Sequence, residues 1–170
     1  MNETAPTFHH VGLTVVDVEK SWRFYSEVVG MTLWDQDKEL GVKAPEERRS
    51  EAGSGGLELL SIHSDAFDEL TNNPGSQIKY VNLRSADGAL IYQLIEYVAG
   101  GGSRLEPDHH RAGSMHLSFF VDDVDVKRAE LKGRGDAAIA SDIVQITPSM
   151  RSFYVTDPDG IPIEFIEIEQ

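Results

Sequence analysis

Two histidines and two side chains with coordinating oxygens occupy equivalent places in a sequence that repeats itself. The stretch His10-Val-Gly-Leu-Thr-Val-Val-Asp-Val18 returns as His116-Leu-Ser-Phe-Phe-Val-Asp-Asp-Val124. The first copy closes on Gln93-Leu-Ile-Glu96 and the second on Glu164-Phe-Ile-Glu167. A duplicated unit fixes which positions are equivalent in space. The four equivalent positions with side chains able to bind a metal are His10, Gln93, His116 and Glu164.

Two imidazoles, one carboxylate and one amide oxygen are ligands for a divalent transition metal. Imidazole suits iron, nickel or zinc, and oxygen ligands suit harder ions such as manganese. The chain has no cysteine, so it has neither a disulfide nor a thiolate site, and any metal is held by nitrogen and oxygen. The sequence therefore predicts a divalent metal ion as cofactor, with manganese, cobalt, nickel, iron and zinc all open.

One member of this candidate set has a rival. Side chains alternate between the two faces of a strand, so Gln93 and Glu96 face opposite sides, as do Glu164 and Glu167. Only one of each pair can face a shared cleft. Alignment on Glu164 selects Gln93, whereas a one-residue slip or a bulge would present Glu96 instead.

The elements that position these residues follow from hydrophobic periodicity. In the first copy, residues 8–16 alternate as a strand, a helix runs from its cap at Asp17 to Gly30, and another strand covers 31–34. Two more strands, 78–83 and 90–97, are joined by Ser85-Ala86-Asp87-Gly88, whose Asp-Gly pair is a hairpin signal. The second copy repeats this order, with a strand from His116, a helix over 124–131, a weak strand over 139–144 and final strands over 152–155 and 161–168.

Two segments stand outside the repeat. Residues 35–77 are dominated by charged and small side chains, including Glu46-Glu47-Arg48-Arg49, with a short helix near 66–70. We interpret them as an insertion without regular structure in the first copy, of the kind that often covers an active site. The glycine-rich residues 100–113 read as a linker. The expected organisation is a first module over 7–99, the linker, and a second module over 114–170.

Three phrases resemble a known family: His9-His10-Val-Gly-Leu-Thr-Val-x-Asp17, Phe24-Tyr25-x4-Gly30-Met31 and Asp157-Pro158-Asp159-Gly160-x3-Glu164. They look like the vicinal oxygen chelate superfamily, which includes glyoxalase I, methylmalonyl-CoA epimerase, extradiol dioxygenases and bleomycin or fosfomycin resistance proteins. The resemblance spans both modules without the insertion and linker. It implies an α+β fold, two βαβββ modules forming a curved mixed sheet around a cleft, and by analogy a homodimer. It also implies one metal held by the first and last strands of the modules, through His10, Gln93, His116 and Glu164.

The resemblance further implies an activity. A metal that chelates a substrate through adjacent oxygens stabilises an enolate as a Lewis acid. Glu164, if it loosens from the metal, corresponds to the general base of the glyoxalase-like members. Glyoxalase I typically has a second glutamate where this chain has Gln93, whereas methylmalonyl-CoA epimerase has glutamine there. The first hypothesis is therefore a metal-dependent isomerase, epimerase or lyase that transfers a proton on a small substrate. A second acid or base would come from elsewhere, for example a glutamate of the insertion.

Two other functions stay open. His10, His116 and Glu164 alone match the two-histidine, one-carboxylate triad of non-haem iron, which extradiol dioxygenases of the superfamily use. Most ring-cleaving members are longer, with four modules. The third hypothesis is a metal-free drug-binding resistance protein, whose acidic charge would suit a cationic drug. The sequence does not say whether the ligands of one site come from one chain or two.

Composition narrows the partners. The 170 residues carry a formal net charge of −14, which repels nucleic acid. No apolar run approaches the roughly 20 residues that cross a bilayer, and the first residues do not resemble a signal peptide. We expect a cytoplasmic protein with a small-molecule partner and no membrane partner.

The remaining histidines and aromatic residues are assigned to structural roles. His9 is expected to point away from His10, and three histidines lie in loops where exposure is the default. None of these enters the candidate set. The loop histidines are His63, His109 and His110, and the aromatic residues expected in the core are Trp22, Tyr25 and Phe119.

Overall fold

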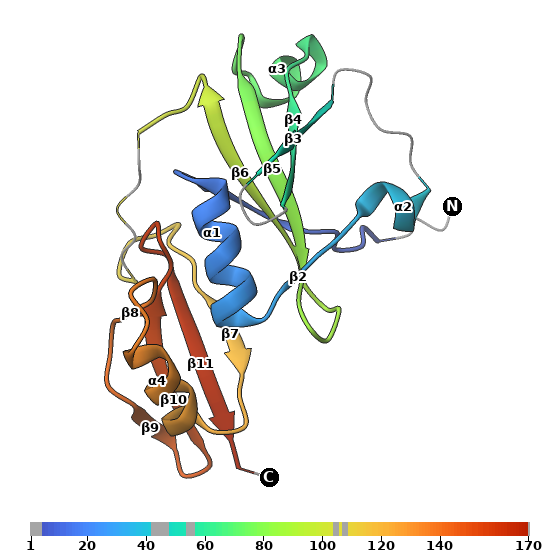
Figure 1. Cartoon of the computed structure of the whole chain (residues 1–170). Coiled ribbons are helices and arrows are strands. Elements are labelled where there is room, and N and C mark those ends of the chain that lie inside the picture. Colours follow the sequence, from blue (N-terminus) through green and yellow to red (C-terminus); the bar gives the residue numbers. More distant parts are fainter. Residues whose placement is uncertain (1–4, 42–47, 54–56, 104–105, 107–108, 170) are drawn as a thin grey trace. The chain divides into compact units, whose positions relative to one another are not determined.

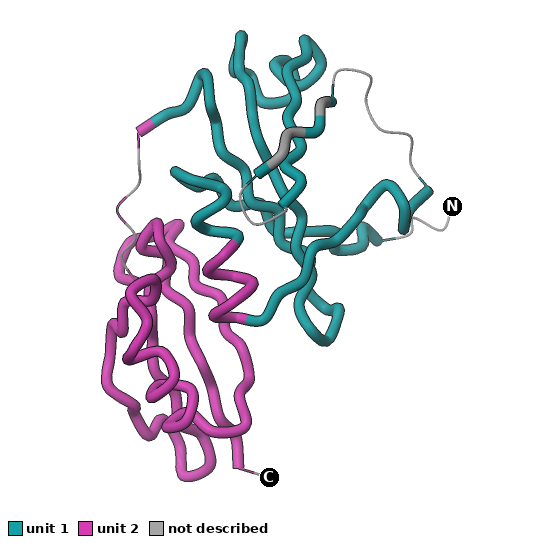
Figure 2. The backbone as a smooth tube through the Cα atoms, in the orientation of Figure 1, with its two compact units in different colours: residues 1–22, 30–102 teal, residues 23–29, 103–170 magenta. Residues whose placement is uncertain are grey.

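The chain folds into two compact units. The computed structural model describes residues 5–41, 48–53, 57–103, 106 and 109–169 (Figure 1). Unit 1 comprises Met1–Trp22 and Gly30–Gly102, and unit 2 comprises Arg23–Val29 and Ser103–Gln170 (Figure 2). The expected linker over 100–113 falls partly on residues outside the described set, 104–105 and 107–108.

Unit 1 is built on a mixed sheet with the strand order β1-β6-β5-β4-β3, in which β2 also pairs with β5. Its first strand lies parallel to its last, and the other neighbours are antiparallel. Leu13, Val15, Tyr92 and Leu94 are buried on one face, as alternation along β1 and β6 requires. The strands are β1 (Val11–Val15), β2 (Thr32–Leu33), β3 (Arg49–Ala52), β4 (Glu58–Ile62), β5 (Gln77–Arg84) and β6 (Ile91–Ala99).

Unit 2 repeats this topology. Its sheet has the order β7-β11-β10-β8, with β9 on β10, and again the first strand lies parallel to the last. Phe153, Val155, Ile163 and Phe165 form the buried face. The prediction of an α+β fold with two βαβββ modules is therefore confirmed. The strands are β7 (Leu117–Phe120), β8 (Ala138–Ile139), β9 (Val144–Thr147), β10 (Met150–Thr156) and β11 (Pro162–Ile168).

The helix of each module starts against the last strand of its sheet. Glu96 of β6 accepts a hydrogen bond from Val18 N at 3.0 Å, where α1 (Val18–Phe24) begins and continues as the π-helical turn η1 (Tyr25–Val29). Glu167 of β11 accepts one from Val124 N at 2.8 Å, where α4 (Val124–Lys132) begins. A carboxylate satisfies an unpaired N–H there and favours the helix dipole. Among the described residues, no helix has the length and apolar character needed to cross a membrane.

The expectation of an irregular insertion over 35–77 is wrong for its described part. This segment forms α2 (Gln36–Leu40), β3, β4 and α3 (Asp65–Thr71), and β4 extends the sheet by pairing with β5. The short helix expected near 66–70 is confirmed. Asp35 and Ser64 cap the two helices, and Leu57 and Leu59 are buried in the alternation typical of a strand. Part of the charged run, residues 42–47, and glycine-rich residues 54–56 lie outside the described set.

The weak strand expected over 139–144 is replaced by two short strands. β8 pairs with the end of β10 and β9 with its beginning, and residues 140–143 form no ladder between them. The cause is a side chain, because Tyr154 N donates to Ser141 Oγ at 2.9 Å. A serine hydroxyl that takes a backbone donor interrupts the ladder locally.

The Asp-Gly signals mark equivalent hairpin turns. Ser85 N donates to Leu90 O at 2.9 Å, and Gly88 has a φ of 74°. In unit 2, Asp157 N donates to Ile161 O at 3.0 Å, and Gly160 has a φ of 84°. Glycine adopts this left-handed conformation without steric cost, which explains its place at the end of both turns.

Asp157 is buried and depends on its hydrogen-bond donors. It accepts from Asp159 N at 2.9 Å, from Ile161 N at 2.8 Å and from the Tyr25 hydroxyl at 2.9 Å, all within unit 2. The pKa of the Asp157 carboxyl is raised, because burial has the largest effect and these hydrogen bonds offset only part of it. Tyr25 is fully buried, as expected, and its hydroxyl stabilises the charged form of Asp157.

Replacing Tyr25 by phenylalanine is expected to lower the free energy of unfolding by about 1–3 kcal/mol near neutral pH. The Tyr25 bond stabilises the ionised carboxylate, so its contribution is present above the pKa of Asp157 and is lost as the pH falls through it. Urea unfolding at two pH values measures this difference. An equal loss at neutral and acidic pH would show that packing, rather than the hydrogen bond, accounts for the effect.

Candidate functional site

The structure brings two of the predicted ligands together in unit 2. His116 Nε2 lies 3.8 Å from Glu164 Oε2, and Ser118 Oγ donates to the same oxygen at 3.1 Å. Ser118 is the register partner of Glu164, and His116 lies two residues before Ser118, just ahead of β7. This separation is close to that of neighbouring ligands each about 2 Å from one ion.

The other two predicted ligands have the same relation in unit 1. Gly12 of β1 is the register partner of Gln93, and His10 precedes Gly12 by two residues. His10 is exposed, and partial burial together with the neighbouring His9 lowers its pKa, which favours the neutral imidazole that binds metals. Each unit thus has one histidine immediately before its first strand and one candidate oxygen ligand on its last strand.

Gln93 and Glu96 have different surroundings in the structure. The Glu96 carboxylate accepts the hydrogen bond from Val18 N at the start of α1, as Glu167 does from Val124 N. Gln93 lines a pocket on the other face of β6. These positions favour Gln93 as the counterpart of Glu164, and Glu96 as the counterpart of Glu167.

A pair of substitutions tests this assignment. Gln93→Ala is expected to weaken metal binding at least tenfold and to lower stability modestly, because it leaves the buried Asn82 Oδ1 without its donor. Glu96→Gln is expected to leave metal affinity unchanged and to cost about 1 kcal/mol of stability through the weaker helix cap. Calorimetric metal titration and thermal unfolding measure the two effects. The reverse pattern would make Glu96 the ligand.

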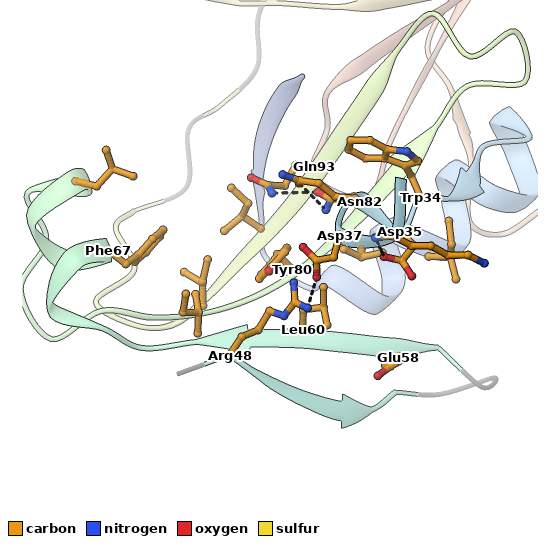
Figure 3. A pocket seen from close by; sticks show the side chains of 18 residues that line it. Trp34, Asp35, Asp37, Arg48, Glu58, Leu60, Phe67, Tyr80, Asn82 and Gln93 are labelled. Carbon is orange, nitrogen blue, oxygen red and sulfur yellow. Dashed lines mark hydrogen bonds and ion pairs between the residues drawn. The ribbon is translucent and has the colours of Figure 1, made fainter. Parts of the chain in front are cut away.

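A buried amide fixes the orientation of Gln93. Gln93 Nε2 donates to Asn82 Oδ1 at 3.0 Å, and Asn82 Nδ2 donates to Gln36 Oε1 at 3.5 Å (Figure 3). Asn82 is 6% exposed and is the register partner of Gln93. With Nε2 held by Asn82, Oε1 is the atom left to coordinate a cation. The sequence analysis did not identify Asn82 as a neighbour of Gln93. The one indication in the sequence is a polar amide between the apolar strand residues Val81 and Leu83.

Two further residues adjoin the half-site in unit 2. Tyr154 is the register partner of Glu164, and burial, the negative charge of Glu164 and a hydrogen bond with it raise the pKa of the Tyr154 phenol. The ring centroid of His109 lies 4.8 Å from that of Tyr154 and 6.2 Å from that of His116. His109 is exposed as expected, but sequence reasoning did not place it beside a candidate ligand.

The expected orientation of His9 is wrong. Its ring contacts that of His10, with Nδ1 atoms 2.7 Å apart and ring centroids 4.9 Å apart. Strand β1 begins at Val11, so the alternation of side chains does not extend back to His9.

The four candidate ligands are divided between the two units. His10 and Gln93 belong to unit 1, and His116 and Glu164 to unit 2. Among the described residues, no three histidine, aspartate or glutamate side chains lie close enough together to hold an ion by themselves. Two neutral nitrogen ligands and two oxygen ligands nevertheless suit a first-row divalent ion. The complete set of four ligands stays a prediction.

Unit 1 contains a pocket of about 790 Å³ beside Gln93, a volume within the range of small-molecule sites. Trp34 and Asp35 lie toward one end, Phe67 lies at the other, and Gln93 lies between them (Figure 3). Much of the wall comes from the segment over 35–77. Its two helices and the strand β4 thus line an open pocket that also includes a predicted metal ligand.

Comparison with known proteins identifies the family. The model of the Glyoxalase/Bleomycin resistance protein/Dioxygenase superfamily matches residues 7–165. The chain belongs to this superfamily. A curated relative, uncharacterized protein YaeR of Escherichia coli K12, is 20% identical over 161 residues, which cover 94% of each chain.

Solved structures of the superfamily share the fold. A glyoxalase family protein from Bacillus cereus has a TM-score of 0.71 at 19% identity, with 100% of this chain and 99% of that chain covered. The trypanothione-dependent glyoxalase I of Leishmania major has a TM-score of 0.54 at 19% identity, covering 96% and 87%. A glyoxalase/dioxygenase from Nostoc punctiforme has a TM-score of 0.56 at 21% identity, covering 100% and 96%. At these identities the likeness concerns the fold.

Proposed function

We propose that the protein is a divalent-metal-dependent enzyme that transfers a proton on a small substrate chelated through adjacent oxygens, as an isomerase, epimerase or lyase. The observation that carries this proposal is the repeated half-site. In both units, a histidine before the first strand and an oxygen ligand on the last strand are related by the same register. In unit 2 the two side chains lie 3.8 Å apart.

The proposed roles follow from the side chains. His10, Gln93, His116 and Glu164 would hold the metal, which as a Lewis acid would make a proton beside a substrate carbonyl removable. Glu164 would accept this proton, and Ser118 orients its carboxylate through the hydrogen bond at 3.1 Å. Gln93 has no useful proton affinity, so it contributes an oxygen donor only.

Metal analysis of protein purified without chelator tests the proposal. We expect a metal content of about one divalent ion per pair of half-sites. His116→Ala is expected to lose most of this metal content. His110→Ala, outside the candidate set, is the matched control. Exchange of carbon-bound hydrogen for deuterium in dihydroxyacetone, followed by NMR, tests the proton transfer. Failure to bind metal even after reconstitution would exclude this function and leave a metal-free binding protein.

A second candidate function leaves Gln93 out of the ligand set. His10, His116 and Glu164 would then remain as the triad of a non-haem iron dioxygenase. Oxygen consumption with catechol and the iron(II)-loaded protein would support this alternative. If this assay shows no oxygen uptake and deuterium exchange is observed, the first proposal is supported.

We also propose a homodimer in the cytoplasm, on the resemblance to superfamily members that associate further and on the absence of cysteine. Light scattering after gel filtration measures the assembly. A monomer at micromolar concentration would contradict the homodimer.

A further inference from the structure

We propose that the pocket of unit 1 binds the non-chelating part of the substrate, and that this part is an uncharged apolar group, a short alkyl chain or an aromatic ring. This inference rests on the proposed function for the chelating end of the substrate. It adds the chemical class of the remainder, which decides which small molecules the enzyme accepts.

The side chains on the pocket face of the sheet change from polar to apolar along its strands. Asn82 and Gln93 form one cross-strand row, Tyr80 and Ile95 the next, with Leu60 opposite Tyr80. A further row pairs Ile62 with Ile78, and all these residues line the pocket. Strand residues two apart are separated by about 7 Å. The lining therefore becomes apolar at Ile95 and Leu60, roughly 7 Å from Gln93. The Tyr80 hydroxyl, which forms a hydrogen bond with Arg48, is the polar group of this row.

Helix α3 closes the apolar end. Phe67 lines the pocket there, and its ring centroid lies 6.5 Å from that of Tyr97 on β6. Leu70 of the same helix also lines the pocket although its side chain is 82% exposed. An exposed leucine on the rim of an apolar cavity gains free energy when a ligand removes it from water.

The charges of the lining disfavour an anionic substituent. The lining contains three acidic side chains and two basic ones, which are Asp35, Asp37 and Glu58, and Lys38 and Arg48. Asp37 forms an ion pair with Arg48, which also keeps the pKa of Arg48 raised, and the Asp35 carboxylate accepts from the backbone of α2. A carboxylate or phosphate in this pocket would therefore meet more negative than positive charge, in a chain with a net charge of −14.

The end of the pocket near Trp34 is fixed in place. Trp34 N donates to Asn82 O at 2.8 Å, which ties its backbone to β5. The Arg84 guanidinium lies 5.3 Å from the centre of the indole ring and forms hydrogen bonds of 2.9 and 2.5 Å with Glu39 of α2. A wall held by a cation–π contact and a two-pronged ion pair needs little rearrangement on binding. This end of the pocket is therefore expected to move little when a ligand binds.

Hydroxamates test the inference, because they chelate metals through two adjacent oxygens. Zinc has no redox chemistry and does not oxidise them. Acetohydroxamate, hexanohydroxamate and the monohydroxamate of adipic acid are titrated into the zinc-loaded protein by calorimetry. Hexanohydroxamate is expected to bind at least tenfold more tightly than acetohydroxamate, since each buried CH₂ contributes about fourfold. The adipic compound, which differs from hexanohydroxamate by a terminal carboxylate, is expected to lose most of this gain.

Two alanine variants, one of a phenylalanine and one of a leucine, show where in the pocket the longer chain binds. Phe67→Ala is expected to remove most of the gain from the longer chain and to leave acetohydroxamate binding unchanged. Leu40→Ala, at an exposed position of α2 that does not line the pocket, is the matched control and is expected to keep the gain. Equal affinities for all three hydroxamates in the metal-loaded protein would overturn the inference and leave the proposed metal function intact.

Failure of the metal site is a distinct result. If the protein binds no zinc, the proposed function falls, and the apolar pocket is then measured in the metal-free protein with the neutral dye Nile red. Fluorescence enhancement that is lost in Phe67→Ala and kept in Leu40→Ala would support the pocket on its own. Enhancement equal in both variants, or absent from the parent protein, would overturn it.

Discussion

Replacing Glu164 by glutamine is expected to lower the rate of deuterium exchange by about 10²–10⁴-fold, the usual contribution of a general base. The substitution keeps the side-chain length and one coordinating oxygen but removes the proton acceptor. Ser118 Oγ, which donates to Glu164 Oε2, can still donate to an amide oxygen. Metal content is therefore expected to fall much less than exchange, and both are measured on the same preparation.

Glu167→Gln is the matched control for this prediction. Glu167 lies three residues further along β11, where it accepts hydrogen bonds from Val124 N and Arg151 instead of adjoining His116. We expect it to reduce stability and to leave exchange unchanged in the folded protein. If Glu164→Gln retained full exchange, Glu164 would be a ligand at most, and the base would have to be sought elsewhere.

The repeat made most of the fold predictable. Once His10 and His116 are aligned, the first strand, the helix and the last two strands of one module each have a counterpart in the other, and the structure reproduces this in two sheets with parallel first and last strands. The helix caps at Glu96 and Glu167 explain why the glutamates at the ends of the two phrases recur. Their spacing of three residues from Gln93 and Glu164 separates a structural carboxylate from a candidate ligand.

The insertion could not be predicted in the same way, because it has no counterpart in the second copy. Its strand β4 is short. The apolar alternation around it covers few residues and follows directly on a run of glycines. Capping signals at Asp35 and Ser64 were present, but a cap without a long apolar stripe indicates only where a helix can begin. Pairing of β4 with β5 is a tertiary effect.

Contacts between side chains distant in sequence were the least predictable part of the candidate site. Asn82 and Tyr154 became visible only through the strand register that sets them beside Gln93 and Glu164. His109 reaches His116 from a turn, where no periodicity constrains a side chain. The repeat in the sequence thus indicates the candidate ligands, and the strand register indicates the residues that could orient them.

Asn82→Leu is expected to weaken metal binding by about 10–100-fold, the usual effect of removing a group that orients a metal ligand. Leucine has a similar size but no acceptor for Gln93 Nε2, so the amide can turn its nitrogen toward the ion. Asn82→Asp keeps the acceptor and is expected to retain affinity within a few-fold. Zinc titration by calorimetry measures both, and thermal unfolding shows whether each variant is folded at the titration temperature.

The pattern across the two variants separates orientation from stability, because a buried aspartate and a buried leucine disturb the sheet in different ways. Equal losses of affinity in both would mean that Asn82 acts only through packing. Unchanged affinity in both, together with unchanged affinity in Gln93→Ala, would remove the amide from the ligand set. The three remaining ligands, His10, His116 and Glu164, would then favour the non-haem iron alternative, because that triad needs no fourth protein ligand.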